Sequence, residues 1–426
     1  MAFQVSPGVN VSEVDLTTVI PAVSTSIGAI AGRFHWGPAD KRVLVDSEDV
    51  LAQVFGNPDS NNFQEWFTAA NFLAYTNALQ VTRVLNSANN ANGAGATNKI
   101  IKNDDDYNDN YSTGISGSGD WIAKYPGELG NSLKVSVCQS NAAWESTLSS
   151  ANLVFHAGNT QIATKGANTT SVLSTGGDID LTGEVVVGDR LHLQSATINL
   201  GDDLEVTAVN TSIITVKTAP TQDQLGVTSN NFSDAVKSAV VKRRWEYYNE
   251  FDASPGTSDF AIRQGGSNDE LHIVVIDDSG KISGTTGAIL EKFTFLSKAD
   301  DAKNSFGDAI YYKDFVSKNS DNIFIGIATG NGTIASGIVT AFTPVSTAQN
   351  TWSQDAQDVD FNFGGNILYE LQGGKDYSGV STEGGYSCSL GSIMGGYEIF
   401  ENEAEYAVNF LLQGPGITGS QAESQA

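Results

Sequence analysis

The first twenty residues have the alternation of a β-strand without a partner beside it. A strand would place Val5, Val9 and Val11 on one face and Val14 on the other. Either a bulge near Ser12 shifts the phase, or the strand is covered on both sides. Because a lone strand is unstable in water, we predict that this extended arm, residues 1–20, pairs with a strand outside itself. The valines concerned are Val5, Val9, Val11 and Val14.

The segment 21–86 has the pattern of a compact unit in which strands and helices alternate. Ser47 is placed to cap a helix that ends before Gly56, and Asn62 to cap a second helix. Glu65 lies three residues after Asn62, as in a capping box. Strands are predicted at 26–32, 42–45 and 79–85. The second helix is predicted to bury a stripe formed by Phe63, Trp66, Phe67, Ala70, Leu73 and Ala74.

The middle of the chain changes from polar to β-rich sequence. Residues 87–120 are rich in Asn, Gly, Ser and Asp, which predicts a polar loop or linker. The segment 121–138 contains an alternating strand around Val135. Residues 139–240 hold short β-like runs separated by turns such as Gly188-Asp189, which favours a small all-β barrel or sandwich.

The segment 241–426 mixes strands and helices. A strand at 271–276, a turn at 277–280 and an extended run at 281–283 would form a hairpin. Residues 287–299 fit either a helix or a strand. Further predictions are an extended run after the turn Pro255-Gly256, a helix at 308–318, a strand at 322–328, a helix after Ser389 and a buried strand at 407–412. Together these elements predict an α+β, β-rich fold with several domains.

Composition limits the partners of this chain. The 426 residues include 49 acidic and 23 basic ones, for a net charge of −26. Nucleic acid and anionic membrane surfaces both attract cationic proteins, so this charge argues against either partner. An apolar run near 18 residues and a signal-peptide pattern are both missing from the sequence, which argues against membrane insertion and secretion. Cys138 and Cys388 are too few and too far apart to predict a disulfide framework or a zinc site.

Motifs that could carry chemistry are weak. Gly414, Gly416 and Gly419 match G-x-G-x-x-G, but a tight turn explains them better than a nucleotide, and the acidic residue expected downstream lies beyond the chain end. The acidic run 104–109 lacks the Gly and Glu of a calcium loop and predicts a solvated loop. The four histidines are scattered. We predict no catalytic residue, no metal site and no cofactor.

The densest basic patch consists of Lys242, Arg243 and Arg244, followed by Trp245. It is too small for nucleic acid against the overall charge. We interpret it as a strand whose cations face carboxylates, either within the subunit or on a neighbouring subunit.

Several sequence blocks stand out along the chain. They are VSPGVNVSEVDLTT (5–18), IGAIAGRFHWGPAD (27–40), VFGNPDSNNFQEWFTAANFLAYTNALQVTRVL (54–85), YPGELG (125–130) and FDASPGTSDFAIRQGGSNDELHIVVIDDSGKISG (251–284). These blocks resemble the tail sheath proteins of contractile-tailed phages of the T4 kind. They cover about half of the chain in the same order as in that family. Since they stand on both sides of 139–240, we interpret that segment as an inserted domain within a discontinuous sheath core.

The resemblance implies a structural subunit and not an enzyme. Subunits would polymerise as stacked hexameric rings around a tail tube, with the baseplate and tail terminator as further partners. On contraction the sheath would drive the tube through the host envelope for genome ejection. The expected location is the virion tail, after assembly in the host cytoplasm. The last seven residues, SQAESQA, begin like a helix and then stop, which predicts that the chain is cut short. The resemblance implies that a C-terminal domain would follow at this point.

Two other functions stay open at the level of sequence. One is a β-rich adhesin or host-binding module, with the inserted segment as the receptor-binding part. The other is the sheath of a contractile injection system that is not a phage. For the arm, the sheath interpretation predicts donation of residues 3–18 to a sheet edge of an adjacent subunit.

Overall fold

The computed structural model describes most of the chain after residue 25. The described residues are 26–60, 62–86, 88–93, 98–112, 115, 119–148, 153–154, 157–164, 185–194, 203–210, 213–225, 240–326, 351–361, 366–376, 388, 390–402 and 408–414. The chain forms two compact units: unit 1 consists of 1–34, 41–84 and 390–426, and unit 2 of 35–40 and 85–389. The predicted α+β class is confirmed, since several sheets occur together with a few short helices.

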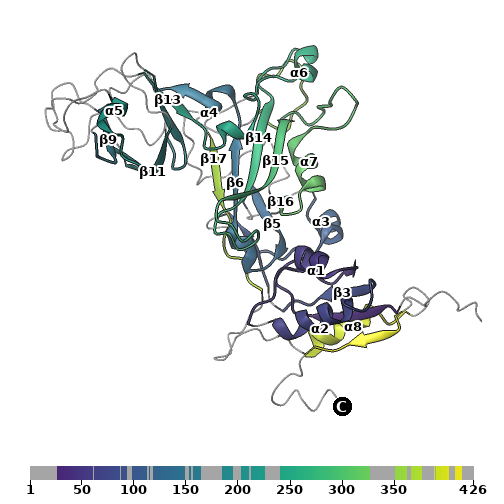
Figure 1. Cartoon of the computed structure of the whole chain (residues 1–426). Coiled ribbons are helices and arrows are strands. Elements are labelled where there is room, and N and C mark those ends of the chain that lie inside the picture. Colours follow the sequence, from purple (N-terminus) through teal and green to yellow (C-terminus); the bar gives the residue numbers. More distant parts are fainter. Residues whose placement is uncertain are drawn as a thin grey trace, which may run out of the picture. The chain divides into compact units, whose positions relative to one another are not determined.

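Unit 1 is a four-stranded mixed sheet with helices on both faces. Its strand order is β18-β1-β3-β2, and in Figure 1 the yellow C-terminal strand lies beside the purple N-terminal one. The central strand β1 is parallel to both β18 and β3, whereas β2 is antiparallel to β3. The strands are β1 (Gly28–Gly32), β2 (Arg42–Val45), β3 (Leu79–Arg83) and β18 (Phe410–Leu412), and the helices are α1 (Glu48–Phe55), α2 (Phe63–Leu73) and α8 (Leu390–Glu398).

The first helix of unit 1 begins and ends as predicted. The Ser47 side chain accepts a hydrogen bond from the amide of Val50, and Gly56 follows the helix with φ of 80°. Leu51 and Phe55 of α1 pack with Ile30 and Trp66 in one apolar cluster. This cluster lies on one face of the sheet, because alternate residues of β1 point to opposite faces.

The second helix differs from its prediction in two ways. Asn62 makes no capping bond with its side chain, whose oxygen accepts from the amide of Asp59 instead. Glu65 is buried and paired with Arg33, so the predicted capping box is wrong. Because Glu65 and Trp66 point inward, the helix is rotated relative to the predicted stripe. Phe63 and Phe67 are therefore 44% and 47% exposed.

Unit 2 contains two antiparallel sheets that share a core. One has the order β15-β14-β6-β17 and the other β16-β5-β4. Side chains such as Trp121, Val135, Ile273 and Trp352 fill the core between them. The strands are β4 (Asn90–Asn92), β5 (Trp121–Pro126), β6 (Leu133–Cys138), β14 (Glu270–Asp277), β15 (Ala288–Ser297), β16 (Ile323–Ile325) and β17 (Ile367–Glu370), and the helical segments are α3 (Asp104–Asn110), η2 (Glu128–Ser132), η4 (Tyr248–Glu250), α6 (Asp259–Gln264) and α7 (Tyr312–Asn319).

The polar segment 87–120 is folded in the part that the structure describes, so the loop prediction is wrong there. Asn90 is buried, and its side chain bonds to the backbone of Ile101 and Ala123. Tyr107 stacks on Phe324 at 4.1 Å between ring centroids. Buried side-chain amides that bond to backbone take the place of apolar contacts, and composition alone does not distinguish them from a solvated loop.

The region 251–299 forms a hairpin with a different second strand from the one predicted. The partner of β14 is β15, with Asp277 opposite Ala288, so the predicted partner 281–283 lies in the turn instead. The ambiguous segment 287–299 is a strand. The run that was predicted to be extended contains α6, which begins after Ser258, whose hydroxyl accepts from the amide of Ala261.

A separate seven-stranded antiparallel sheet lies between 145 and 244, within unit 2. Its order is β7-β13-β10-β11-β12-β9-β8, and it has its own apolar core that includes Leu191, Val206 and Ile214. An inserted domain with bounds 139–240 stays a prediction, and the last strand of this sheet continues to Arg244. The strands are β7 (Glu145–Thr147), β8 (Leu153–Val154), β9 (Gln161–Thr164), β10 (Arg190–Gln194), β11 (Leu204–Asn210), β12 (Ile213–Val216) and β13 (Val240–Arg244), with the short helices α4 (Asn141–Trp144) and α5 (Gln222–Leu225).

The C-terminal elements of unit 1 are α8 and β18. A Cβ on Gly396 would lie 2.7 Å from Val84 Cγ2 and 2.9 Å from Ala31 Cβ, so α8 packs closely against the second face of the sheet. Among the described helices, α8 included, none has the length and apolar character needed to cross a bilayer. The strand β18 was predicted to be buried, which is wrong. Phe410 and Leu411 are 53% and 64% exposed because β18 is an edge strand.

Two glycines of α8 provide a matched test of this packing. We expect Gly396→Ala to destabilise unit 1, because a rigid Ala31 Cβ blocks the added methyl group. We expect Gly395→Ala, which meets nothing within 4 Å, to stabilise the helix by up to about 1 kcal/mol. Denaturant unfolding of the two variants measures the difference. Equal effects of both substitutions would show that the contact with β1 does not restrain α8.

Candidate assembly site

The outer edge of β18 is the first candidate for contact with another chain. The amide of Phe410 donates to the carbonyl of Ile27, so this residue directs its backbone toward β1. Because backbone groups of successive strand residues point to opposite sides, the N–H and C=O of Leu411 point away from the sheet. The side chain of Phe410 adjoins Phe72 of α2 at 6.3 Å between ring centroids. An apolar edge with outward backbone groups is suited to pairing with another strand.

The predicted donor residues Val5, Val9, Val11 and Val14 lie outside the described residues. The glycine motif at 414–419 also lies outside them, apart from Gly414. Strand donation by the arm therefore stays a prediction.

The predicted basic patch lies in β13, a strand of the seven-stranded sheet. Its three cations have partners inside the chain. Lys242 Nζ lies 2.6 Å from Glu145 Oε1, and Arg244 Nε lies 2.8 Å from Glu145 Oε2. Arg244 also reaches Asp203 at 3.1 Å. Burial disfavours the ionised form of Glu145, but hydrogen bonds from Lys242 and Arg244 outweigh it and lower its pKa.

Arg243 is fully buried and joins several segments of unit 2. Its Nη2 donates to the carbonyls of Ala142 and Ala143, each at 2.9 Å, and its Nη1 lies 3.4 Å from Asp189 Oδ1. The same Asp189 oxygen accepts from Asn366 at 3.1 Å. Burial raises the pKa of Asp189, and the charge of Arg243 offsets this only in part.

Lys298 is a second buried basic residue that binds the segment before β7. Its Nζ donates to the carbonyls of Gln139 and Asn268, each at 2.7 Å, and lies 5.2 Å from the Trp352 ring. Burial lowers the pKa of Lys298 to about 7, against the opposing charge of Asp269. Two buried basic side chains, Arg243 and Lys298, thus fix residues 139–143, where the chain enters the seven-stranded sheet.

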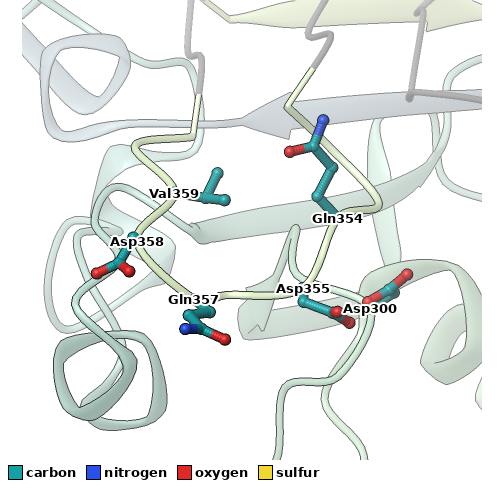
Figure 2. Close-up of a pocket in the computed structure, with 6 residues that line it drawn as sticks. All are labelled: Asp300, Gln354, Asp355, Gln357, Asp358 and Val359. Atoms are coloured by element: carbon teal, nitrogen blue, oxygen red, sulfur yellow. The ribbon is translucent and has the colours of Figure 1, made fainter.

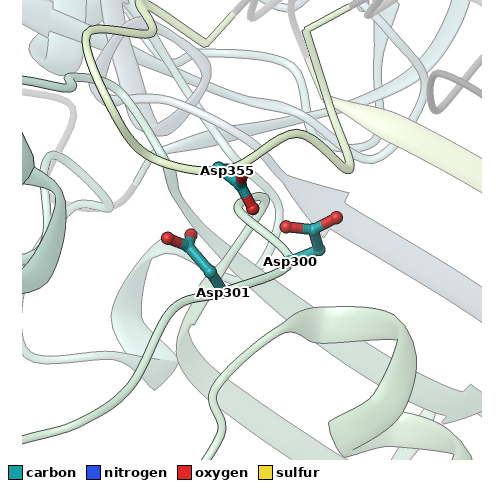
Figure 3. A group of neighbouring side chains, drawn as sticks. All are labelled: Asp300, Asp301 and Asp355. Carbon is teal, nitrogen blue, oxygen red and sulfur yellow. The ribbon is translucent and has the colours of Figure 1, made fainter.

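An acidic group lies at a pocket elsewhere in unit 2. The pocket has a volume of about 540 Å³. Its lining residues, drawn in Figure 2, are Asp300, Gln354, Asp355, Gln357, Asp358 and Val359. One carboxylate oxygen from each of Asp300, Asp301 and Asp355 lies within 4.8 Å of the other two. Figure 3 shows these three side chains as neighbours. Burial raises the pKa of Asp300, and a hydrogen bond with Asp355 raises it further. Oxygen ligands of this kind suit a hard cation, but a Ca²⁺ site has six or more ligands.

Other residues weighed for chemistry have structural positions. The acidic run at 104–106 is the first turn of α3, where carboxylates stabilise the helix dipole. His272 donates from Nε2 to the carbonyl of Ala253, and its Nδ1 accepts from the amide of Phe295, which fixes one neutral tautomer. Burial lowers the pKa of His272. The thiol of Cys138 is buried, which raises its pKa to about 12.

Comparison with known proteins identifies relatives. A tail sheath protein of Salmonella phage ViI is 26% identical over 336 residues, which is 76% of this chain and 49% of the relative. A tail sheath protein of Vibrio phage KVP40 is 27% identical over 291 residues, 65% of this chain and 40% of the relative. The tail sheath protein of Enterobacteria phage T4 is 36% identical over 80 residues, 19% of this chain and 12% of the relative. This chain is related to phage tail sheath proteins.

The chain spans about half the length, or less, of the curated sheath relatives it matches. No family model matches. Two solved structures of sheath tail proteins also align. The one from Listeria innocua has 13% identity, a TM-score of 0.19, and coverage of 46% of this chain and 34% of its own. The one from Desulfitobacterium hafniense has 12% identity, a TM-score of 0.18, and coverage of 55% and 40%. These TM-scores are too low to indicate a shared fold.

Sequence reasoning missed several residues of the candidate assembly site. The outward edge of β18 was assigned to a buried strand. Lys298 was not singled out, and Gly188-Asp189 was predicted only as a turn, because the partners of Lys298 and Asp189 are backbone carbonyls and an amide from distant segments.

The Arg243 contacts predict a large and local effect on stability. We expect Arg243→Met to cost about 3–5 kcal/mol, since it leaves Asp189 as an unpaired buried charge. Adding Asp189→Asn should recover part of this loss. The matched control is Lys217→Met in the same sheet, which breaks an exposed pair with Glu205 and should cost less than about 1 kcal/mol. Chemical denaturation measures all three variants. A small effect of Arg243→Met would contradict its role as an anchor.

The buried lysine predicts a pH dependence of stability. The pKa of Lys298 is about 7 in the folded chain and about 10.4 when unfolded. The unfolded state therefore binds more protons between these values, and stability should fall as the pH decreases from about 10 to about 7. Lys298→Met should flatten this slope, although two carbonyls lose their donor. Unfolding free energies measured from pH 7 to 9.5 test the slope, and an unchanged slope in the variant would refute it.

Proposed function

We propose that this chain is a structural subunit of a contractile tail sheath and not an enzyme. The observation that carries the proposal is its similarity to phage tail sheath proteins over 76% of its length. Subunits would stack as hexameric rings around the tail tube, between the baseplate and the tail terminator. Contraction of this sheath would drive the tube through the host envelope and allow genome ejection. The chain would then be part of the virion tail after assembly in the host cytoplasm.

The physical basis that we propose for polymerisation is strand addition. Residues 3–18 of one subunit would pair with an open sheet edge of its neighbour, satisfying backbone groups on both strands. The outward edge of β18 supports this, because Leu411 is exposed and its backbone points away from β1. A tether of this kind can stay paired while compact units rotate past one another.

The energy of contraction would come from many small and equal contributions. A gain of about 2 kcal/mol per subunit favours the contracted arrangement about thirtyfold for each subunit. Because every subunit of a polymer contributes in the same way, the whole lattice changes state together.

A second contact between subunits would use the basic strand. Lys242 and Arg244 keep 30% and 19% side-chain exposure while they bind Glu145, so a carboxylate of a neighbour could approach them. Arg243 is fully buried and would act indirectly, by holding residues 142–143 in place.

The test is deletion of residues 1–18 from the protein. We expect a variant with unchanged circular dichroism and thermal unfolding that forms no striated tubes in negative-stain microscopy. Leu411→Pro should have the same effect from the acceptor side, because proline removes the outward N–H of an edge strand without disturbing its pairing with β1. Leu411→Thr, which keeps the N–H, is the control and should form tubes.

The outcomes separate the two levels of the proposal. Normal tubes from the deletion variant would refute strand donation by the arm and leave the sheath function standing. Absence of tubes from the unaltered protein, with the isolated segment 139–240 binding host cells, would favour an adhesin instead.

A further inference from the structure

The outward face of α2 is an aromatic surface that the described residues of the chain leave uncovered. Phe63, Phe67 and Tyr75 recur at intervals of four or eight residues, so they follow one line along the helix and its end. Their exposed fractions are 44%, 47% and 93%. Between them stands Asn71, which is also exposed. Isolated apolar residues are common on surfaces, whereas three aromatic side chains in one line form a patch.

This aromatic face is held rigidly. The ring of Phe67 contacts Trp66 edge-on at 5.2 Å between centroids. Trp66 is buried, and its Nε1 donates to the carbonyl of Gly56 at 2.9 Å. The opposite side of α2 packs on β1, where a Cβ on Gly28 would lie 2.4 Å from Phe72. Because packing against β1 already fixes the helix, docking on its outer face would cost little ordering of the backbone.

The aromatic face is also free of charge. From Phe63 to Leu79 the chain contains one Asp, Glu, Lys or Arg, namely Glu65. Glu65 points inward, is buried and is paired with Arg33. The whole chain carries a net charge of −26, so two copies repel one another over most of their surfaces. An uncharged aromatic surface is where a second copy meets the least repulsion, and aromatic enrichment with few charges is the composition of interface centres.

We propose that the outer face of α2 is a docking surface for a second copy of this chain, distinct from the strand-addition edge at β18. Charge makes other occupants less suitable. An anionic membrane would require basic residues around the aromatic ones, and α2 has none. The proposal rests on the proposed self-assembly, because it names one of the surfaces through which copies would meet.

The first experiment measures association of the full chain by sedimentation velocity. We expect the variant Phe63→Ser with Phe67→Ser to associate at least about tenfold more weakly than the unaltered chain. The matched control is Ile262→Ser on α6, which removes an exposed apolar side chain, 60% exposed, from unit 2 and should leave association unchanged. Circular dichroism and thermal unfolding verify that each variant is folded.

The second experiment reports contact directly. Both natural cysteines, Cys138 and Cys388, are buried, so Asn71→Cys offers one accessible thiol for a benzophenone maleimide. Irradiation of the assembled protein should give crosslinked dimers, and the two serine substitutions should abolish them. Assembly without crosslinks from position 71, or with crosslinks only to another tail protein, would overturn the docking surface alone. Absence of any association would overturn both this inference and the proposed function.

Discussion

The sheet of unit 1 depends on the pairing of two strands from opposite ends of the chain. Ile27 precedes β1, and Asn409 lies 382 positions further along the chain. The carbonyl of Ile27 accepts a hydrogen bond from the amide of Asn409, and the amide of Ile27 donates one to Asn409 Oδ1. Ordering the intervening chain opposes this pairing only weakly, because closure entropy grows with the logarithm of loop length. The packing of α8 against Ala31 and Val84 adds contact on the second face. As β18 occupies one side of β1, it becomes the edge of the sheet, and this position exposes its apolar residues.

Buried polar groups contribute to the geometry of unit 2 together with its apolar core. Asn90, Arg243 and Lys298 each bond to backbone carbonyls from distant segments. Such contacts add little net energy, but leaving any partner unsatisfied is costly, so they select one arrangement among several that bury similar apolar area. The entry to the seven-stranded sheet is therefore fixed in direction. In the proposed sheath, a rigid connection at that point would let the subunit move as a compact unit.

Charge relates the fold to assembly. An acidic chain stays soluble as a monomer, and its copies approach one another best where charge is absent or neutralised inside the subunit. The edge of β18 and the outer face of α2 both lack charged side chains, since Glu65 is turned inward to Arg33. The strong cations of β13 are similarly paired with Glu145 and Asp203. Unit 1 thus combines an acidic composition with uncharged surfaces that suit contact between copies.

Local sequence determined the elements whose signals are short in range. The cap at Ser47, the strand at Leu133–Cys138 and the helix after Ser389 follow from hydroxyl chemistry and apolar periodicity. The family resemblance followed from the order of sequence blocks, and the comparisons bear it out. Tertiary structure alone decided the rotation of α2, the folding of the described part of 87–120 and the exposure of β18. Each of these depends on a partner far away in the sequence: Arg33 for Glu65, Ile101 for Asn90 and β1 for β18. A local pattern shows that a side chain is polar or apolar, but only the position of its partner decides whether it faces the core or the solvent.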